Sequence, residues 1–306
     1  KYNVHCGVDV SKKYLDAFID GKTVRFENTV SGVSKLMSCA GDVHYVFEST
    51  GGYERLATWQ LLAGDHTASI VNPGRVREYA KSVGQFAKTD SIDAEMITQF
   101  AGIAKLKNAV LPSKEQRELT ALVDRRTSLT EMMNMEENRL ETVGETCGRK
   151  SIEKHVRWLR KELDEINERI DKIVGSNEEL KCKSDRIRSI SGLGRVTAMT
   201  LLAYMPEMGT LSRRKVAALA GLAPYNRDSG SYSGRRHICG GRKRLRSCLY
   251  MAALTAVRAD PYFGEFYRRL VEDNNRPKKV ALVAVMRNLL ITANSVLKNP
   301  EFPVEI

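Results

Sequence analysis

The periodicity of the apolar residues changes twice along this chain of 306 residues, and these changes constrain the fold more than any other feature. The first part alternates between strand patterns with a period of two and short helical patterns. The middle part carries apolar residues at steps of three and four, which is typical of long helices. The last part is helical and basic. We therefore expect three domains, with boundaries at 1–108, 109–183 and 184–306.

The first domain is predicted to contain a mixed sheet with helices on its faces. Strand patterns cover residues 2–10, 14–20, 23–27, 43–48 and 68–71, and helical patterns cover residues 32–39, 53–63 and 91–104. Three strands in succession, followed by alternating helices and strands, indicate an α/β fold. The last strand ends at Asn72-Pro73, a dipeptide that favours a turn.

The middle domain is predicted to form two long helices, interrupted near residues 144–150. The first seam consists of Leu119, Leu122, Arg126, Leu129, Met133, Glu136, Leu140 and Val143. The second consists of Ile152, Val156, Leu159, Leu163, Ile166, Ile170 and Ile173. The polar residues Arg126 and Glu136 weaken the first seam but can fix its register. A helical hairpin, an intermolecular coiled coil and two helices of a globular bundle all fit this pattern.

The net charge favours a polyanionic partner. The chain has 49 Lys and Arg against 37 Asp and Glu, a formal net charge of +12, within an otherwise ordinary globular composition. Each phosphate that a basic residue neutralises releases counterions, so such an excess favours nucleic acid. The alternative is an enzyme that is merely basic.

The six cysteines are scattered, without a CxxC pair or zinc-ligand spacing. We expect reduced thiols and a cytoplasmic, nucleoid-associated protein of a bacterium. No apolar run approaches the roughly 20 residues of a membrane helix. The chain runs directly into a strand pattern, so we expect no signal peptide.

Two acidic residues stand at the ends of apolar strands. Asp9 lies at the end of the first strand pattern, just before Val10, and Glu48 ends the strand VHYVFE. A buried carboxylate is costly unless it meets a cation or a hydrogen-bond donor. Two such strands at one sheet edge would build a metal site, although polar residues are also common at strand ends.

A second acidic pair occurs in the segment KTDSIDA. Asp90 and Asp93 are three residues apart, so on a helix both project from one face. Asp90 is also a plausible N-cap residue, an alternative that explains one aspartate better than both. With Asp9 and Glu48 they would supply hard oxygen ligands for Mg²⁺, for which Mn²⁺ can substitute. Two such ions can hold the attacking and leaving oxygens of a phosphodiester transfer.

The segment SISGLGR, residues 189–195, precedes an apolar helix. Its two glycines, Gly192 and Gly194, would let backbone N–H groups approach a phosphate, with Arg195 beside them. This is the form of a helix-hairpin-helix element that binds the DNA backbone. The alternative is a plain glycine turn between two helices.

Residues 225–244 are predicted to form a basic loop rich in glycine and serine. A serine there, Ser229, stands between an acid and a glycine and can attack phosphorus if a base or a metal activates it. Arginines would stabilise the charge that develops on the phosphoryl oxygens. From composition alone, simple phosphate binding is the more common role of such a loop. The predicted nucleic-acid contacts are Arg227, Arg235, Arg236, Arg242, Lys243, Arg244 and Arg246.

Together these segments resemble the DEDD-type insertion-sequence transposases, which are bridge-RNA-guided serine recombinases related to the Piv invertases. The N-terminal motifs are GVDVSK, VFESTGGYE and VNPGRVREYAKSVGQFAKTDSIDAEMI. The C-terminal motifs are SISGLGRVTAMTLLAYM, LAGLAPYNRDSG and GGRKRLRSCLYMAALTA. They follow the family's order over nearly the whole chain. The resemblance implies an RNase H-like (RuvC-like) catalytic domain, long coiled-coil helices and a helical transposase domain.

The resemblance also implies specific roles. The metal-binding tetrad falls on Asp9, Glu48, Asp90 and Asp93, and the nucleophile falls on Ser229, with Ser231 and Ser233 as nearby alternatives. It implies a 5′-phosphoserine intermediate and a site in which the acids of one subunit meet the serine of another. A dimer or tetramer held by the helices around residues 114–174 would follow. The expected partners are target and donor DNA and a guide non-coding RNA.

Two other functions remain open. A RuvC-like structure-specific nuclease would use the same acids with water as its nucleophile, and Ser229 would then only contact phosphate. A non-catalytic nucleic-acid-binding module is disfavoured, because four acids would repel DNA without a metal ion between them.

Overall fold

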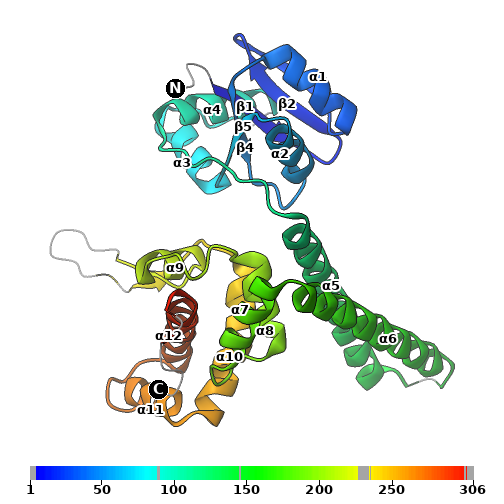
Figure 1. Ribbon diagram of the computed structural model, residues 1–306, viewed down its shortest axis with the longest axis vertical. Coiled ribbons are helices and arrows are strands. Elements are labelled where there is room, and N and C mark those ends of the chain that lie inside the picture. Colours follow the sequence, from blue (N-terminus) through cyan, green and yellow to red (C-terminus); the bar gives the residue numbers. More distant parts are fainter. Residues whose placement is uncertain are drawn as a thin grey trace. The chain divides into compact units, whose positions relative to one another are not determined.

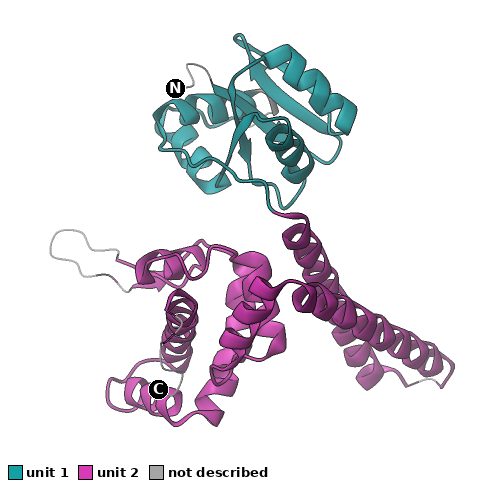
Figure 2. Cartoon of the chain, viewed as in Figure 1, with its two compact units in different colours: residues 1–112 teal, residues 113–306 magenta. Residues whose placement is uncertain are grey.

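The chain folds as two units, residues 1–112 and residues 113–306, and each unit has its own hydrophobic core (Figure 2). The computed structural model describes residues 5–87, 90–144, 146–226, 234, 236–299 and 301, without the side chains of Asp90 and Ser91.

A five-stranded mixed sheet forms the centre of the first unit (Figure 1). Its strands, in the spatial order β3-β2-β1-β4-β5, are β1 (His5–Val10), β2 (Tyr14–Ile19), β3 (Lys22–Glu27), β4 (His44–Glu48) and β5 (Thr67–Val71). The first three strands form an antiparallel meander, whereas β4 and β5 run parallel to β1. The predicted mixed sheet is therefore present, and every strand agrees with its predicted segment within a few residues.

Helices cover both faces of this sheet. On one face α1 (Val30–Ala40) and α2 (Glu54–Ala63) pack against Val8, Leu15 and Phe47. On the other face α3 (Pro73–Ser82) and α4 (Asp90–Ile103) pack against Val46 and Val71. Successive residues of a strand point to opposite faces, which is why Val46 and Phe47 belong to different clusters.

Helix α3 is an addition to the elements predicted from sequence. The Asn72-Pro73 dipeptide ends β5 as expected, but it also begins a helix. The Asn72 side chain accepts a hydrogen bond from the Gly74 amide at 2.8 Å, and Pro73 occupies the first helical position. Asparagine as an N-cap and proline at the first position are both favourable helix starts.

The two long helices form a hairpin within the chain. Helices α5 (Lys114–Thr142) and α6 (Thr146–Ser176) run antiparallel, because Glu137 pairs with Arg160 while Arg126, earlier in α5, contacts Asn167, later in α6. Of the three arrangements that fitted the sequence pattern, the structure shows the intramolecular hairpin. Arg126, the polar residue of the first seam, donates from Nε to Asn167 Oδ1 at 2.9 Å. Burial is the main cause that lowers the pKa of the Arg126 guanidinium, and the positive charge of Arg195 lowers it further.

The rest of the second unit is a helical bundle. Its elements are α7 (Glu178–Arg188), α8 (Arg195–Tyr204), α9 (Arg213–Leu219), α10 (Lys243–Ala259), α11 (Pro261–Val271), α12 (Lys278–Lys298) and the two-residue strands β6 (Pro224–Tyr225) and β7 (His237–Ile238).

Helix α12 corrects the expectation that no apolar run approaches membrane-spanning length. Its 21 residues are long and apolar enough by composition to cross a membrane. However, 56% of its apolar window is buried inside the unit, where residues such as Leu289 and Ala293 join the common core. The burial identifies α12 as a core helix.

Candidate functional site

The register of the sheet brings two of the predicted acids to one edge. Strands β1 and β4 are parallel, and their last paired residues are Val8 and Phe47. Asp9 and Glu48 are the next residue on each strand, so they lie at the same level on neighbouring strands. By alternation both side chains leave the sheet on the face covered by α3 and α4. Both residues are half-buried.

Helix α4 reaches this edge because residue 7 has no side chain. The Gly7 amide donates to Thr98 Oγ1 at 2.8 Å, and this hydroxyl donates to the Ala94 carbonyl at 3.0 Å. A Cβ on Gly7 would lie 2.5 Å from the Ala94 oxygen and the Thr98 nitrogen. The helix therefore lies directly on β1, which brings Asp93, the neighbour of Ala94, towards the strand ends.

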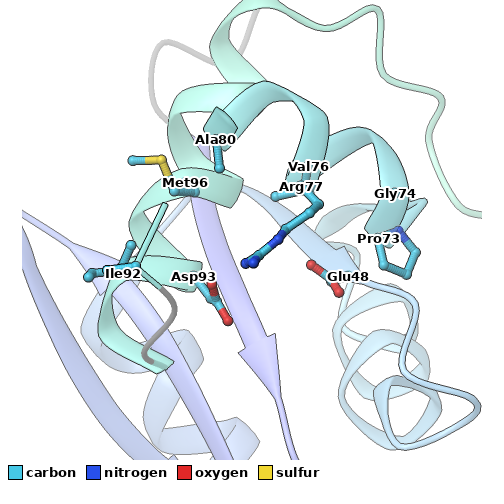
Figure 3. A pocket seen from close by; sticks show the side chains of 10 residues that line it. Glu48, Pro73, Gly74, Val76, Arg77, Ala80, Ile92, Asp93 and Met96 are labelled. Carbon is cyan, nitrogen blue, oxygen red and sulfur yellow. The ribbon is translucent and has the colours of Figure 1, made fainter. Parts of the chain in front are cut away.

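Glu48 and Asp93 line one cavity of about 300 Å³ (Figure 3). One carboxylate comes from the end of β4 and the other from the first turns of α4. Arg77 of α3 extends between them in this view. The remaining described lining residues are largely apolar: Pro73, Gly74, Val76, Ala80, Ala87, Ile92 and Met96.

The other two acids of the predicted tetrad are Asp9 and Asp90. Asp9 is not among the residues that line the cavity. Asp90 begins α4, one turn before Asp93, as the three-residue spacing predicted, and its side chain lies outside the described part. Within the described residues, no group of three or more His, Cys, Asp or Glu side chains is arranged as a metal centre. Metal binding by the four acids stays a prediction.

Sequence reasoning missed the network that holds the loops beside the acids. Glu54 is buried and accepts hydrogen bonds from the Thr50 amide at 3.2 Å, the Thr50 hydroxyl at 3.1 Å and the Gly52 amide at 2.9 Å. These bonds order the loop that directly follows Glu48. The signal in the sequence was the TGGYE motif, in which the glycines adopt positive φ angles and the final acid caps the loop.

Asn28 connects the loops that follow the two strand-end acids. Its Nδ2 donates to the Ser11 carbonyl, just after β1, and to the Tyr53 carbonyl, just beyond β4, both at 3.1 Å. The Asn28 amide also donates to the Lys13 carbonyl at 2.8 Å. Because one side chain holds both loops, the ends of β1 and β4 are positioned as a unit.

The segment SISGLGR, residues 189–195, makes several contacts within the second unit. A Cβ on Gly192 would lie 2.6 Å from the Ala256 Cβ, so this glycine allows α10 to pack closely. Gly194 precedes α8 as its N-cap residue. Arg195 donates from Nη2 to Asp171 Oδ2 at 2.5 Å and to the Asn167 carbonyl at 2.8 Å. These contacts support the plain-turn alternative, and contact with DNA stays a prediction for all three residues.

Several of the predicted phosphate contacts also have partners within the unit. Arg242 pairs with Glu207 at 2.7 Å, and Arg244 pairs with Asp124 at 2.6 Å. Arg246 donates to the carbonyls of Gly240 and Ala220. Lys243 and Arg236 are exposed. Arg227, Ser229, Ser231, Ser233 and Arg235 lie outside the described residues.

The ends of the serine segment are held together. Tyr225 of β6 pairs with His237 of β7 in an antiparallel ladder. Behind this ladder, Gly241 packs against the backbone of Gly221 so closely that a Cβ on either glycine would overlap the other segment. The GLAP motif before Ser229 and the GGR motif after it are therefore packed against each other.

Comparison with known proteins agrees with this arrangement. Residues 6–143 match a family model for the DEDD domain of IS110 transposases, described as "Transposase", and residues 184–268 match the "Transposase IS116/IS110/IS902 family". The chain is 29% identical to the pilin gene-inverting proteins of Moraxella lacunata and Moraxella bovis, over 96% of this chain and 95% of each relative. It is also 35% identical, over 34% of this chain and 27% of the relative, to an uncharacterized 42 kDa protein of the insertion element IS900 from Mycobacterium paratuberculosis.

The fold, the acidic sheet edge and these matches define an enzyme of the DNA recombinase and transposase class. Its DEDD domain implies an RNase H-like fold for the first unit and the use of a divalent metal ion, typically Mg²⁺. More specifically, the chain belongs to the IS110/IS116/IS902 family of transposases.

Proposed function

We propose that this transposase cleaves and rejoins DNA through a covalent phosphoserine intermediate, with Ser229 as the nucleophile and Asp9, Glu48, Asp90 and Asp93 as the ligands of Mg²⁺. The observation that carries the proposal is the meeting of acids at one sheet edge. Asp9 and Glu48 lie at one level on parallel strands, and Glu48 shares a cavity with Asp93.

The donor set fits a magnesium ion. All four side chains offer hard carboxylate oxygens, which Mg²⁺ and Mn²⁺ prefer, without a nitrogen or sulfur ligand. Two of them stand at the ends of apolar strands, where a carboxylate is costly unless it is compensated. When bound, the ion neutralises charge on the phosphoryl oxygens at the reacting phosphorus. The chain's own contribution is to hold the ligands through Gly7, Asn28 and Glu54.

The proposed serine reaction exchanges a phosphate ester of the DNA 3′ oxygen for a phosphate ester of the serine oxygen. A bond forms between Ser229 Oγ and phosphorus as the bond from phosphorus to the 3′ oxygen breaks. The serine hydroxyl loses its proton, the 3′ oxygen gains one, and the 5′ phosphate remains on the protein. Rejoining is the reverse reaction with the 3′ hydroxyl of another strand. The relatives named for inverting a pilin gene support this proposal, because inversion requires strands to be cut and rejoined.

The proposal includes a site shared between copies of the chain. The acids belong to the first unit, and Ser229 belongs to the second. In a dimer or tetramer, the acids of one copy would meet the serine of another. A guide RNA from the element itself would select the target and donor DNA. The formal charge of +12 supports partners rich in phosphate.

The decisive experiment begins with sequencing the nucleic acid that co-purifies with the protein, which supplies substrates. With Mg²⁺, we expect a protein–DNA adduct that survives denaturing electrophoresis. Ser229→Ala should abolish this adduct, and Asp93→Asn should abolish cleavage while RNA binding is retained. EDTA should stop the reaction, and full activity in EDTA would exclude the mechanism.

One alternative function shares the same acidic edge. A RuvC-like nuclease would hydrolyse DNA with water, so Ser229→Ala would continue to cut and wild type would form no adduct. A binding module without catalysis would show no change in any cleavage assay after Asp9→Ala. The serine variant therefore separates recombinase from nuclease, and the aspartate variant separates both from a binding module.

A further inference from the structure

The cavity at the acidic edge contains a cation that the proposed metal-binding tetrad does not include. Arg77 lines the same cavity as Glu48 and Asp93, and its side chain reaches between the two carboxylates in Figure 3. Among the described lining residues it is the one basic side chain, and the other neighbours are mainly aliphatic.

Helix α3 presents Arg77 to the cavity. Val76 and Ala80 of this helix are buried against the sheet face that also buries Val46. Arg77 lies beside Val76 and three residues before Ala80, at the border of the buried face, and the residue itself is exposed. Arg75 has the same charge, on the same helix, but its guanidinium lies 5.1 Å from the centroid of the Phe100 ring and does not line the cavity.

The Arg77 guanidinium in this cavity can have one of two chemical roles. It can serve only as a counter-ion for Glu48 and Asp93. It can also bind phosphate, because its planar set of donors matches phosphoryl oxygens and remains charged at every relevant pH. A DNA strand whose reacting phosphate lies at the carboxylates would bring its oxygens to the cavity that Arg77 lines.

We propose that Arg77 contacts a non-bridging phosphoryl oxygen of the DNA strand that is cleaved at the acidic edge. This inference rests on the proposed function and adds a substrate-binding residue to it. Arg77 then balances the repulsion between the strand's phosphates and the carboxylates that lie closest to them. Exposure of the side chain permits this contact without unfolding or opening of the first unit.

The test compares Arg77→Ala and Arg77→Lys with Arg75→Ala, which removes an equal charge from the same helix. DNA affinity is measured with Ca²⁺ in place of Mg²⁺, a condition chosen to suppress cleavage, and Mn²⁺ affinity is measured without DNA by electron paramagnetic resonance. We expect Arg77→Ala to weaken DNA binding by about tenfold to a hundredfold, as for a lost hydrogen bond to a charged group. Arg77→Lys should lose less, and Arg75→Ala less still.

The Mn²⁺ measurement distinguishes the two uses of the guanidinium. A phosphate contact predicts that Mn²⁺ affinity does not fall in Arg77→Ala while DNA affinity does. If Arg77→Ala binds DNA as Arg75→Ala does, the proposal is overturned, and tighter Mn²⁺ binding in that case would identify Arg77 as a counter-ion. A separate result would contradict the proposed function itself: Asp93→Asn would still bind Mn²⁺ and cleave DNA.

Discussion

Gly7→Ala tests whether close contact between α4 and β1 builds the acidic edge. The added Cβ would lie 2.5 Å from two backbone atoms of α4, the Ala94 oxygen and the Thr98 nitrogen, so the helix must move away from the strand. Overpacking of this kind costs about 1–3 kcal/mol. Movement of the helix also weakens the hydrogen bond from the Gly7 amide to Thr98 Oγ1, which contributes about 1 kcal/mol. We expect a total loss of about 2–4 kcal/mol in the free energy of unfolding.

The assay is urea unfolding of Gly7→Ala and of a matched control, together with Mn²⁺ binding by the folded proteins. The control is Gly102→Ala, on the exposed side of the same helix, where an added Cβ meets nothing within 4 Å. Alanine is favoured over glycine inside a helix, so the control should gain up to about 1 kcal/mol. Gly7→Ala should also bind Mn²⁺ more weakly, because Asp93 moves with α4. Stability and Mn²⁺ affinity equal to wild type in Gly7→Ala would refute the close-contact argument.

Glu54, His44 and the pair Arg235 and Arg236 provide three further tests. Glu54→Ala should lower Mg²⁺-dependent cleavage more than Glu54→Gln, because glutamine retains an acceptor for the loop after Glu48; equal activity of both variants and wild type would exclude this positioning role. Burial is the main cause that lowers the pKa of His44, and the charge of His5 lowers it further. The folded state therefore favours the neutral ring, and the free energy of unfolding should fall as the pH drops through the ordinary histidine value near 6.5. Urea unfolding at pH 7.5 and 5.5 should show a smaller difference for His44→Gln than for wild type. Replacement of Arg235 and Arg236 by alanine should flatten the salt dependence of nucleic-acid binding, and an unchanged slope would count against phosphate contacts there.

Local spacing was enough to predict the main elements of the first unit and the long helices. The short apolar run of residues 43–48 indicates a buried strand, and the three-to-four spacing around Leu159 and Leu163 reports which side of a helix is apolar. The same logic placed Asp9 and Glu48 at strand ends and Asp90 and Asp93 one helical turn apart. Each inference depends on neighbours within a few residues, which the sequence displays directly.

The tertiary structure alone decided how these local elements combine. Whether the long helices pair within one chain depends on their three-residue connection and on contacts such as Arg126 with Asn167. Arg242 and Arg244 looked like free phosphate contacts in a basic loop, but Glu207 and Asp124, distant in sequence, pair with them. The placement of Arg77 beside Glu48 and Asp93 likewise required the docking of α3 and α4 on one sheet face. Such contacts join residues far apart in the chain, so no local pattern records them, and they exist only once the core has packed.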